Sequence, residues 1–250
     1  MRPNRVRTLF AEGRVIVNAW LSIAAPYAAE ITGHAGFDAV TVDLQHGMVG
    51  FDSVVGMLQA ISSTPAIPLV RPPSSDPVAI MKLLDAGAYG VIAPQVDTRE
   101  ICAAVVAACR YPPVGSRSFG PTRGLTYGDP DYVGHANAEI LALAMIESRA
   151  ALGSLDAILD VPGLDGLYVG PNDLAMSLGF APGGHVAEVE AAIAQILAAG
   201  RRRRLLCGIF CASGEDAARR REQGFHLVTP GNDAAALRTH YARALEQARS

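Results

Sequence analysis

Several residue types are scarce in this chain of 250 residues. It has one lysine, Lys82, one tryptophan and four cysteines. Lys82 lies in a helix-like pattern and does not follow a strand-like run, which disfavours a mechanism in which a lysine forms a Schiff base with a carbonyl substrate. The cysteines lie within apolar patterns and form no CxxC pair, which is typical of reduced, buried thiols in a cytoplasmic protein. They are Cys102, Cys109, Cys207 and Cys211.

Long apolar runs and an excess of one charge are also missing. No window has the length of a membrane span, and residues 1–13 lack the apolar core of a signal peptide. The net charge of −3 gives no electrostatic footprint for nucleic acid. We therefore expect a cytoplasmic protein that binds neither nucleic acid nor membranes. The basic cluster 201–204 closes an Ala-rich helical pattern, where solvated cations suit a helix C-terminus, with an anion site as the alternative.

Short apolar runs alternate with amphipathic segments along the whole chain. The runs are 15–20, 38–44, 67–72, 90–95, 140–148, 166–173, 205–210 and 226–231. The segments between them are 26–36, 51–62, 77–87, 99–110, 149–161, 185–200 and 213–224, and several end in glycine. Runs that are almost continuously apolar indicate parallel strands covered on both faces. Eight strands alternating with helices predict an α/β fold, a (β/α)8 TIM barrel in one domain of residues 1–250, with a doubly wound open sheet as the alternative.

One connection, residues 111–135, is unusually long and rich in glycine, proline, serine and aromatic residues. A connection of this length in a compact domain is usually functional or lies at an interface. Arg117 and Arg123 within it are candidates to complete the site of a neighbouring subunit.

Polar and ionisable residues gather where the strand-like runs end. Because the active site of such a barrel lies at the C-terminal ends of its strands, we expect these side chains to share one mouth. They are Asp43, His46, Arg71, Gln95, Glu147 and Asp173.

Glu147 and Asp173 offer hard oxygen ligands on neighbouring strands. Two carboxylates with water or substrate oxygens suit Mg²⁺ or Mn²⁺, with Co²⁺, Ni²⁺ and Zn²⁺ as further candidates. The alternatives are that each carboxylate pairs with an arginine, or that Asp173 caps the following helix.

Asp43, three residues before His46, is placed to orient its imidazole, and this pairing favours general acid/base chemistry. Arg71 has a planar fork for carboxylate or enolate oxygens, with a structural ion pair as the alternative. The other histidines lack such a context, and we expect them to be structural or exposed. They are His34, His135, His185, His226 and His240.

The turn Gly170-Pro171-Asn172-Asp173 leads into a helical pattern, where free backbone N–H groups can hold an anionic group of the substrate. Gln95 is a further candidate donor in the mouth, or caps the fourth run. Trp20 and Phe210 end the first and seventh runs and are candidates for the pocket wall. Phe210 would then limit the room for a substituent on C3 of the nucleophile, with ordinary core filling as the alternative.

Six motifs in this order resemble the HpcH/HpaI aldolase family from about Trp20 to Leu237: VDLQHG, LVRPP, LLDAGAYGVIAPQV, YPPVGSRSFGP, MIES and YVGPNDLAMSLG. The resemblance implies a metal-dependent (class II) aldolase for pyruvate-type 2-keto acids. It also implies a homohexamer, a trimer of dimers that exchange a C-terminal helix.

The resemblance also implies roles for matched positions. These are acid/base catalysis by His46 with Asp43, contact of Arg71 with the keto oxygen, metal ligation by Glu147 and Asp173, contact of Asp85 with a neighbouring subunit's site, and binding of the substrate carboxylate near Gly170, Asn172 and Asp173. Gln45 and Met145 depart from the family pattern, where many relatives have Glu and some have Gln. The substrate can therefore not be copied from one relative.

The expected reaction is reversible cleavage of a 4-hydroxy-2-keto acid to an aldehyde and pyruvate, or a hydroxypyruvate-like 2-keto acid. His46 would take the proton of the 4-hydroxyl, directly or through water, while Arg71 adds positive charge where the enolate oxygen develops. One alternative is a metal-dependent enolising lyase or isomerase on the same barrel. Another is a non-catalytic barrel that binds a keto acid and turns over nothing.

Overall fold

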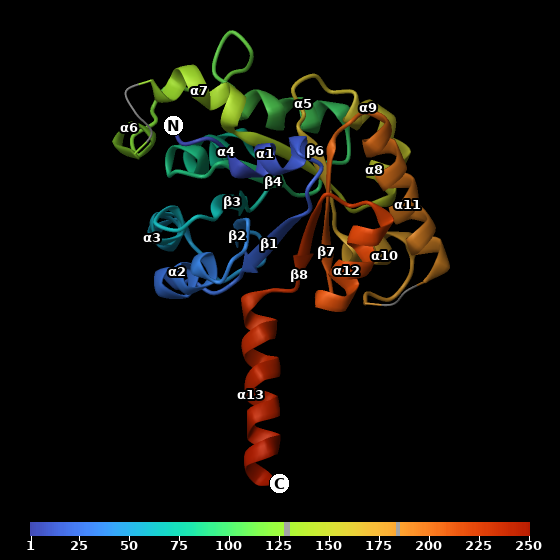
Figure 1. Ribbon diagram of the computed structural model, residues 1–250. Helices are drawn as coiled ribbons and strands as arrows, with labels where there is room; N and C mark the ends of the chain where they lie inside the picture. Colours follow the sequence, from blue (N-terminus) through green and yellow to red (C-terminus); the bar gives the residue numbers. More distant parts are fainter. Residues whose placement is uncertain (128–130, 184–185) are drawn as a thin grey trace.

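Eight parallel strands close into a barrel in chain order (Figure 1). The computed structural model describes residues 1–127, 131–183 and 186–250. The strands are β1 (Ile16–Leu21), β2 (Ala39–Asp43), β3 (Ile67–Arg71), β4 (Gly90–Ala93), β5 (Leu141–Ile146), β6 (Gly166–Val169), β7 (Leu206–Cys211) and β8 (Leu227–Pro230). Each lies within or next to one predicted run, so the (β/α)8 barrel is confirmed, and the pairing of β1 with β8 excludes the open sheet.

Helices surround the barrel, and at least one follows each strand. They are α1 (Arg5–Ala11), α2 (Pro26–His34), α3 (Phe51–Ser62), α4 (Pro77–Asp85), α5 (Arg99–Ala108), α6 (Gly124–Tyr127), α7 (Tyr132–Glu139), α8 (Arg149–Gly153), α9 (Leu155–Leu159), α10 (Pro171–Leu178), α11 (Ala187–Arg202), α12 (Gly214–Gln223) and α13 (Asp233–Arg249). Asp76, Thr98, Ser148 and Ser213 begin four of them with a side-chain hydrogen bond to a free backbone N–H.

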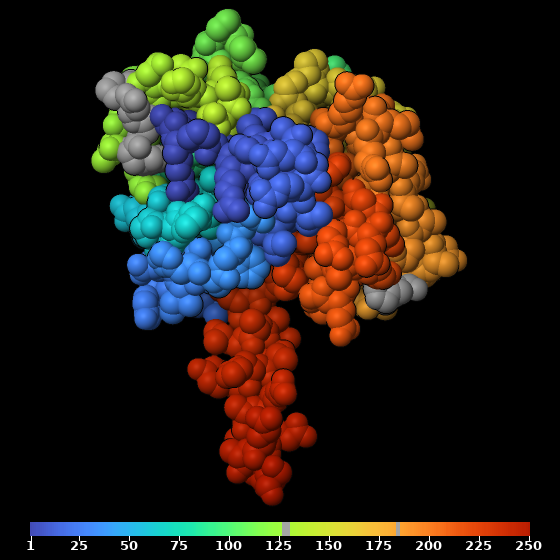
Figure 2. All heavy atoms as spheres, viewed as in Figure 1, coloured from blue at the N-terminus to red at the C-terminus, as the bar shows by residue number. Residues whose placement is uncertain are grey.

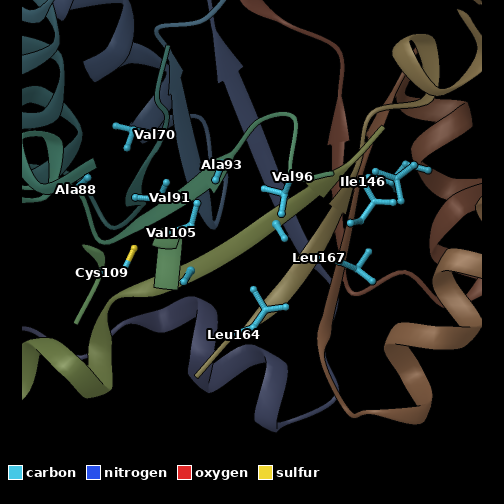
Figure 3. Packing of buried hydrophobic residues seen from close by; sticks show 14 of the residues in the cluster. Val70, Ala88, Val91, Ala93, Val96, Val105, Cys109, Ile146, Leu164 and Leu167 are labelled. Carbon is cyan, nitrogen blue, oxygen red and sulfur yellow. The ribbon is translucent and has the colours of Figure 1, made fainter. Parts of the chain in front are cut away.

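Alternating strand residues fill two separate apolar layers. Inward-facing side chains such as Leu69, Leu143 and Tyr168 fill the barrel interior. Outward-facing side chains such as Val91 and Leu167 pack against the helices, as Figure 3 shows. Because both faces are buried, the strands read as continuous apolar runs.

A short N-terminal helix closes the N-terminal end of the barrel. α1 inserts Val6 and Leu9 into the inner apolar layer, and Asn4 before it accepts a hydrogen bond from the Val6 N–H. At the same end, directly before β6, Asp165 pairs with Arg7 and Arg110 at 2.7 and 2.6 Å. The sequence pattern did not predict this helix, because seven residues are too few for a clear periodicity.

Three segments differ from the expectation. The pattern 149–161 forms two short helices, α8 and α9, which meet at Gly153 and Ser154. The connection 111–135 is partly helical, since it contains α6 and the start of α7, and its residues 128–130 lie outside the described ranges. The run 166–173 ends as a strand at Val169 because Pro171 begins α10. His185, at the start of another predicted helix, also lies outside the described ranges.

The last helix, α13, projects away from the barrel (Figures 1 and 2). It has no buried residue, and Leu237, Tyr241 and Leu245 are exposed along it. Within the described ranges no helix is long and apolar enough to cross a lipid bilayer. The four cysteines are buried and free, as expected, and burial raises the pKa of Cys109 to about 12.

Candidate active site

A cavity of about 290 Å³ opens at the C-terminal ends of the strands. Its lining is Trp20, Ser22, Asp43, His46, Arg71, Met145, Gly170, Pro171, Asn172, Asp173, Phe210 and Asn232. Most of the residues predicted for the site therefore meet in one place, although they come from different strands and turns.

Asp43 and Arg71 form the buried centre of this cavity. They are register partners on β2 and β3. The guanidinium donates from Nε and Nη2 to the two carboxylate oxygens at 2.8 and 2.6 Å. Burial raises the pKa of Asp43. The hydrogen bonds and positive charge of Arg71 lower it, and so do the backbone N–H groups of His46 and Gln45. Together they outweigh burial, so the pKa lies below its ordinary value. The arginine is thus fixed at one edge, and its Nη1 makes no hydrogen bond to the described part of the chain.

His46 contacts Asp43 through its backbone. The His46 N–H donates to Asp43 Oδ1 at 3.3 Å, and the Gln45 N–H donates to the same oxygen at 3.0 Å. The structure shows no hydrogen bond between Asp43 and the imidazole, which is exposed. We expected Asp43 to orient the ring; instead it holds the turn that carries the ring. Gly47 makes this turn fit, because a Cβ there would lie 2.2 Å from the Asp43 carbonyl oxygen and 3.0 Å from Ser22 Cα.

Trp20 and Phe210 form an aromatic wall of the cavity. Their rings meet edge to face at 5.7 Å, and the Arg71 guanidinium lies 4.9 Å from the Trp20 ring centroid. The indole N–H of Trp20 donates to Asp43 Oδ2 at 3.3 Å. A smaller cavity of about 70 Å³ lies next to the main one and shares Phe210 as a wall.

Glu147 lies one residue beyond β5, next to the cavity-lining Gly170, and its exposed fraction is 5%. Its Oε1 accepts a hydrogen bond from the Gln95 N–H at 2.8 Å. Its Oε2 faces Gly170, where an added Cβ would come within 2.6 Å. Burial raises the pKa of Glu147, the Gln95 N–H opposes the rise, and the negative charge of Asp173 adds to it.

Asp173 lies in the first turn of α10 and is exposed to the cavity. The predicted alternative that it caps this helix is wrong, since the N-cap residue is Gly170 and no side chain caps the helix. Within the described ranges the carboxylate makes no hydrogen bond or ion pair. The first hydrogen bond of the turn runs from Leu174 N–H to Gly170 carbonyl, which leaves the N–H groups of Asn172 and Asp173 without helical partners.

These two carboxylates fit a divalent cation. They are hard oxygen donors of the same charge, close enough for Asp173 to raise the pKa of Glu147, and a cation between them would remove that repulsion. In the described ranges no group of three or more His, Cys, Asp or Glu side chains could hold a metal ion. The remaining ligands would therefore be oxygens of water or substrate.

Two predicted residues lie elsewhere. The Gln95 side chain is exposed and does not line the cavity, so its contribution is the backbone N–H that binds Glu147. Asp85 ends α4 and lines a separate groove together with Arg123. It pairs with the buried Arg117 at 2.7 Å, and its pKa is raised by burial although Arg117 lowers it.

The sequence reasoning missed Ser22 and Asn232, which also line the cavity. Ser22 follows β1 and Asn232 follows β8, so a search for polar residues after all eight strands would have found both. Asn232 caps α13 through the Ala235 N–H, and Asp233 accepts hydrogen bonds from the backbone of Ser22 and Ile23. The base of the projecting helix is thus attached to the cavity wall.

The chain is similar to known proteins along nearly its whole length. The model of the HpcH/HpaI aldolase/citrate lyase family matches residues 17–239. The chain is 44% identical to hydroxypyruvate/pyruvate aldolase of Rhizorhabdus wittichii over 99% of both chains. It is 34% identical to 5-keto-4-deoxy-D-glucarate aldolase of Salmonella paratyphi C over 94% of this chain and 93% of that one.

A crystal structure of an HpcH/HpaI aldolase/citrate lyase family protein from Burkholderia cenocepacia superposes with a TM-score of 0.93. It is 33% identical and covers 99% of this chain and 100% of its own. The aldolase relatives support a lyase that makes and breaks carbon–carbon bonds. The chain therefore belongs to the HpcH/HpaI aldolase/citrate lyase family.

Proposed function

We propose that this protein is a divalent-metal-dependent aldolase that cleaves 4-hydroxy-2-keto acids to an aldehyde and pyruvate or hydroxypyruvate, and catalyses the reverse addition. The observation that carries the proposal is the pair of carboxylates, Glu147 and Asp173, beside an arginine that is fixed at one edge and free at the other. Mg²⁺ or Mn²⁺ held by these carboxylates would act as a Lewis acid toward the keto acid.

Three groups of this chain would bind and orient the 2-keto acid. The free Nη1 of Arg71 is suited to the keto oxygen, where negative charge develops as the enolate forms. The N–H groups of Asn172 and Asp173 at the start of α10 are suited to the carboxylate. Trp20 and Phe210 would exclude water from the methyl side of the nucleophile and limit the size of its C3 substituent.

His46 would move the proton. In the cleavage direction it takes the proton of the 4-hydroxyl, directly or through a water molecule, the C3–C4 bond breaks, and its electrons pass to the enolate. Protonation of the enolate at C3 then gives the 2-keto acid. In the addition direction His46 returns that proton to the new alkoxide. Asp43 supports this step by holding the turn that carries His46.

We also propose a homohexamer, a trimer of dimers, in which α13 packs on a neighbouring subunit. The exposed Leu237, Tyr241 and Leu245 on a helix with no buried residue support this assembly. Asp85 would then reach a neighbour's site from its groove. Sedimentation of the full chain should give one species of six copies; a monomer at micromolar concentration would contradict the assembly.

The decisive experiment is an assay of pyruvate release over a panel of 4-hydroxy-2-keto acids. We expect turnover with Mn²⁺ or Mg²⁺ and almost none after rigorous chelation. His46→Ala should lose most of the turnover and keep its far-UV circular dichroism spectrum. Full activity in the chelated enzyme would sink the metal assignment, and wild-type kcat in His46→Ala would refute the role of that residue.

A further inference from the structure

The peptide bond between Pro94 and Gln95 is held at both ends. Its carbonyl oxygen accepts a hydrogen bond from the Ser75 hydroxyl at 2.5 Å. Its N–H donates to Glu147 Oε1 at 2.8 Å. Because a peptide unit is planar and rigid, a group that fixes the carbonyl also fixes the direction of the N–H. Ser75, in the turn after β3, is therefore connected to a carboxylate at the end of β5.

The backbone adopts an unfavourable conformation to make this connection. Gln95 has a φ of 53°, in the left-handed region that residues other than glycine rarely enter. Its side chain is exposed and has no hydrogen bond within the described ranges. The conformation persists only if the surroundings fix it, and the surroundings here are Ser75 on one side and Glu147 on the other.

The same loop also fixes the residue after Glu147. Asp97 accepts a hydrogen bond from the Ser148 hydroxyl at 2.5 Å, and that hydroxyl accepts one from the Ala151 N–H at 2.9 Å. The turn after β4 thus holds the end of β5 at two consecutive residues. Of these contacts, the one from the Gln95 N–H acts on the Glu147 carboxylate itself.

We propose that Ser75 is a positioning residue for the metal carboxylate Glu147, acting through the Pro94–Gln95 peptide. With Oε1 held by the Gln95 N–H, Oε2 is the oxygen that faces Gly170 and the turn that carries Asp173. Hydrogen bonds that orient a ligand lower the cost of ordering it when the metal binds. This inference rests on the proposed function, since it takes Glu147 to be a ligand.

The test measures the dissociation constant of Mn²⁺ by electron paramagnetic resonance, together with the melting temperature of the metal-free protein. Ser75→Ala should weaken Mn²⁺ binding roughly tenfold or more, as loss of an outer-shell partner does. Ser75→Thr keeps the hydroxyl and should restore most of the affinity. Ser74→Ala is the matched control, because Ser74 is the adjacent, exposed serine. Glu147→Gln gives the reference for loss of the ligand itself.

The outcomes separate this inference from the proposed function. Unchanged Mn²⁺ affinity in Ser75→Ala, while Glu147→Gln loses binding, overturns the positioning role alone. Unchanged Mn²⁺ affinity in Glu147→Gln overturns the metal site. A loss of affinity in Ser75→Ala that Ser74→Ala matches or that Ser75→Thr does not restore shows general loosening of the turn, and also overturns the positioning role.

Discussion

The two ends of the barrel treat their charged side chains differently. At the N-terminal end the Asp165 carboxylate is satisfied by Arg7, Arg110 and the Ala142 N–H. At the C-terminal end Glu147 and Asp173 are carboxylates of like charge with no cationic side chain bonded to either within the described ranges. The repulsion between two uncompensated carboxylates is tolerated where a ligand offsets it, as the proposed cation would.

The largest effect should come from the carboxylates at the mouth. Glu147→Gln or Asp173→Asn should lower kcat/KM for aldol cleavage by at least about 100-fold, because charge stabilisation of the enolate depends on the cation they hold. Steady-state kinetics at saturating Mn²⁺ measure this. If either variant keeps more than a tenth of wild-type activity, its carboxylate is not needed to hold the cation.

The opposite end should give a loss of stability instead. Asp165→Asn leaves Arg110 buried without its carboxylate and should cost about 3 kcal/mol, or roughly 6–12 °C in melting temperature for a chain of this size. Activity of the folded protein at 25 °C should stay near wild type. If the variant melts like wild type but has lost turnover, Asp165 at the N-terminal end acts on catalysis and not on stability.

Phe210 separates the main cavity from the smaller one. Phe210→Val should join the main cavity to the smaller one behind the ring. In the addition direction with the same aldehyde, the ratio of kcat/KM for 2-oxobutyrate to kcat/KM for pyruvate should then rise roughly tenfold. This is the effect expected for one methyl group. An unchanged ratio would mean that Phe210 is only core filling.

The smallest effects concern pH and the metal-free protein. The folded pKa of Glu147 is raised, so its contribution to stability is present at low pH and is lost as pH rises through that pKa. Glu147→Gln should remove this loss and slightly raise stability at neutral pH. Urea unfolding in chelator from about pH 4 to about pH 8 measures it.

The stability contribution of Asp43 should change with pH in the opposite direction to that of Glu147, in the same experiment. Its folded pKa is lowered, so its contribution is present above the ordinary carboxyl pKa and is lost as pH falls through the folded value. Asp43→Asn should therefore lose stability at neutral pH, where Glu147→Gln gains it. If both variants gained or both lost stability at neutral pH, the charge of Asp43 would not be compensated while that of Glu147 is uncompensated.

Much of this site follows from chain order alone. Strand-end positions in a parallel barrel converge, so Asp43, Arg71 and Asp173 could be assigned to one mouth without coordinates. The hydrogen-bond partner of the Asp43 carboxylate could not be assigned in this way, because the sequence allows either His46 or Arg71. Only the β2–β3 register shows that Arg71 lies opposite Asp43. The backbone role of Gln95 was also hidden, since a φ of 53° at a glutamine has no sequence signal.

The projecting helix α13 has a thermodynamic consequence. Its 17 residues bury no side chain in their own subunit, and an isolated helix of this length is only marginally stable in water. In the proposed hexamer its order would come from association and would follow mass action: at high protein concentration the helix is formed, and on dilution it frays. Because Asp233 at its base holds the backbone of Ser22 in the cavity wall, dilution should loosen that wall as well.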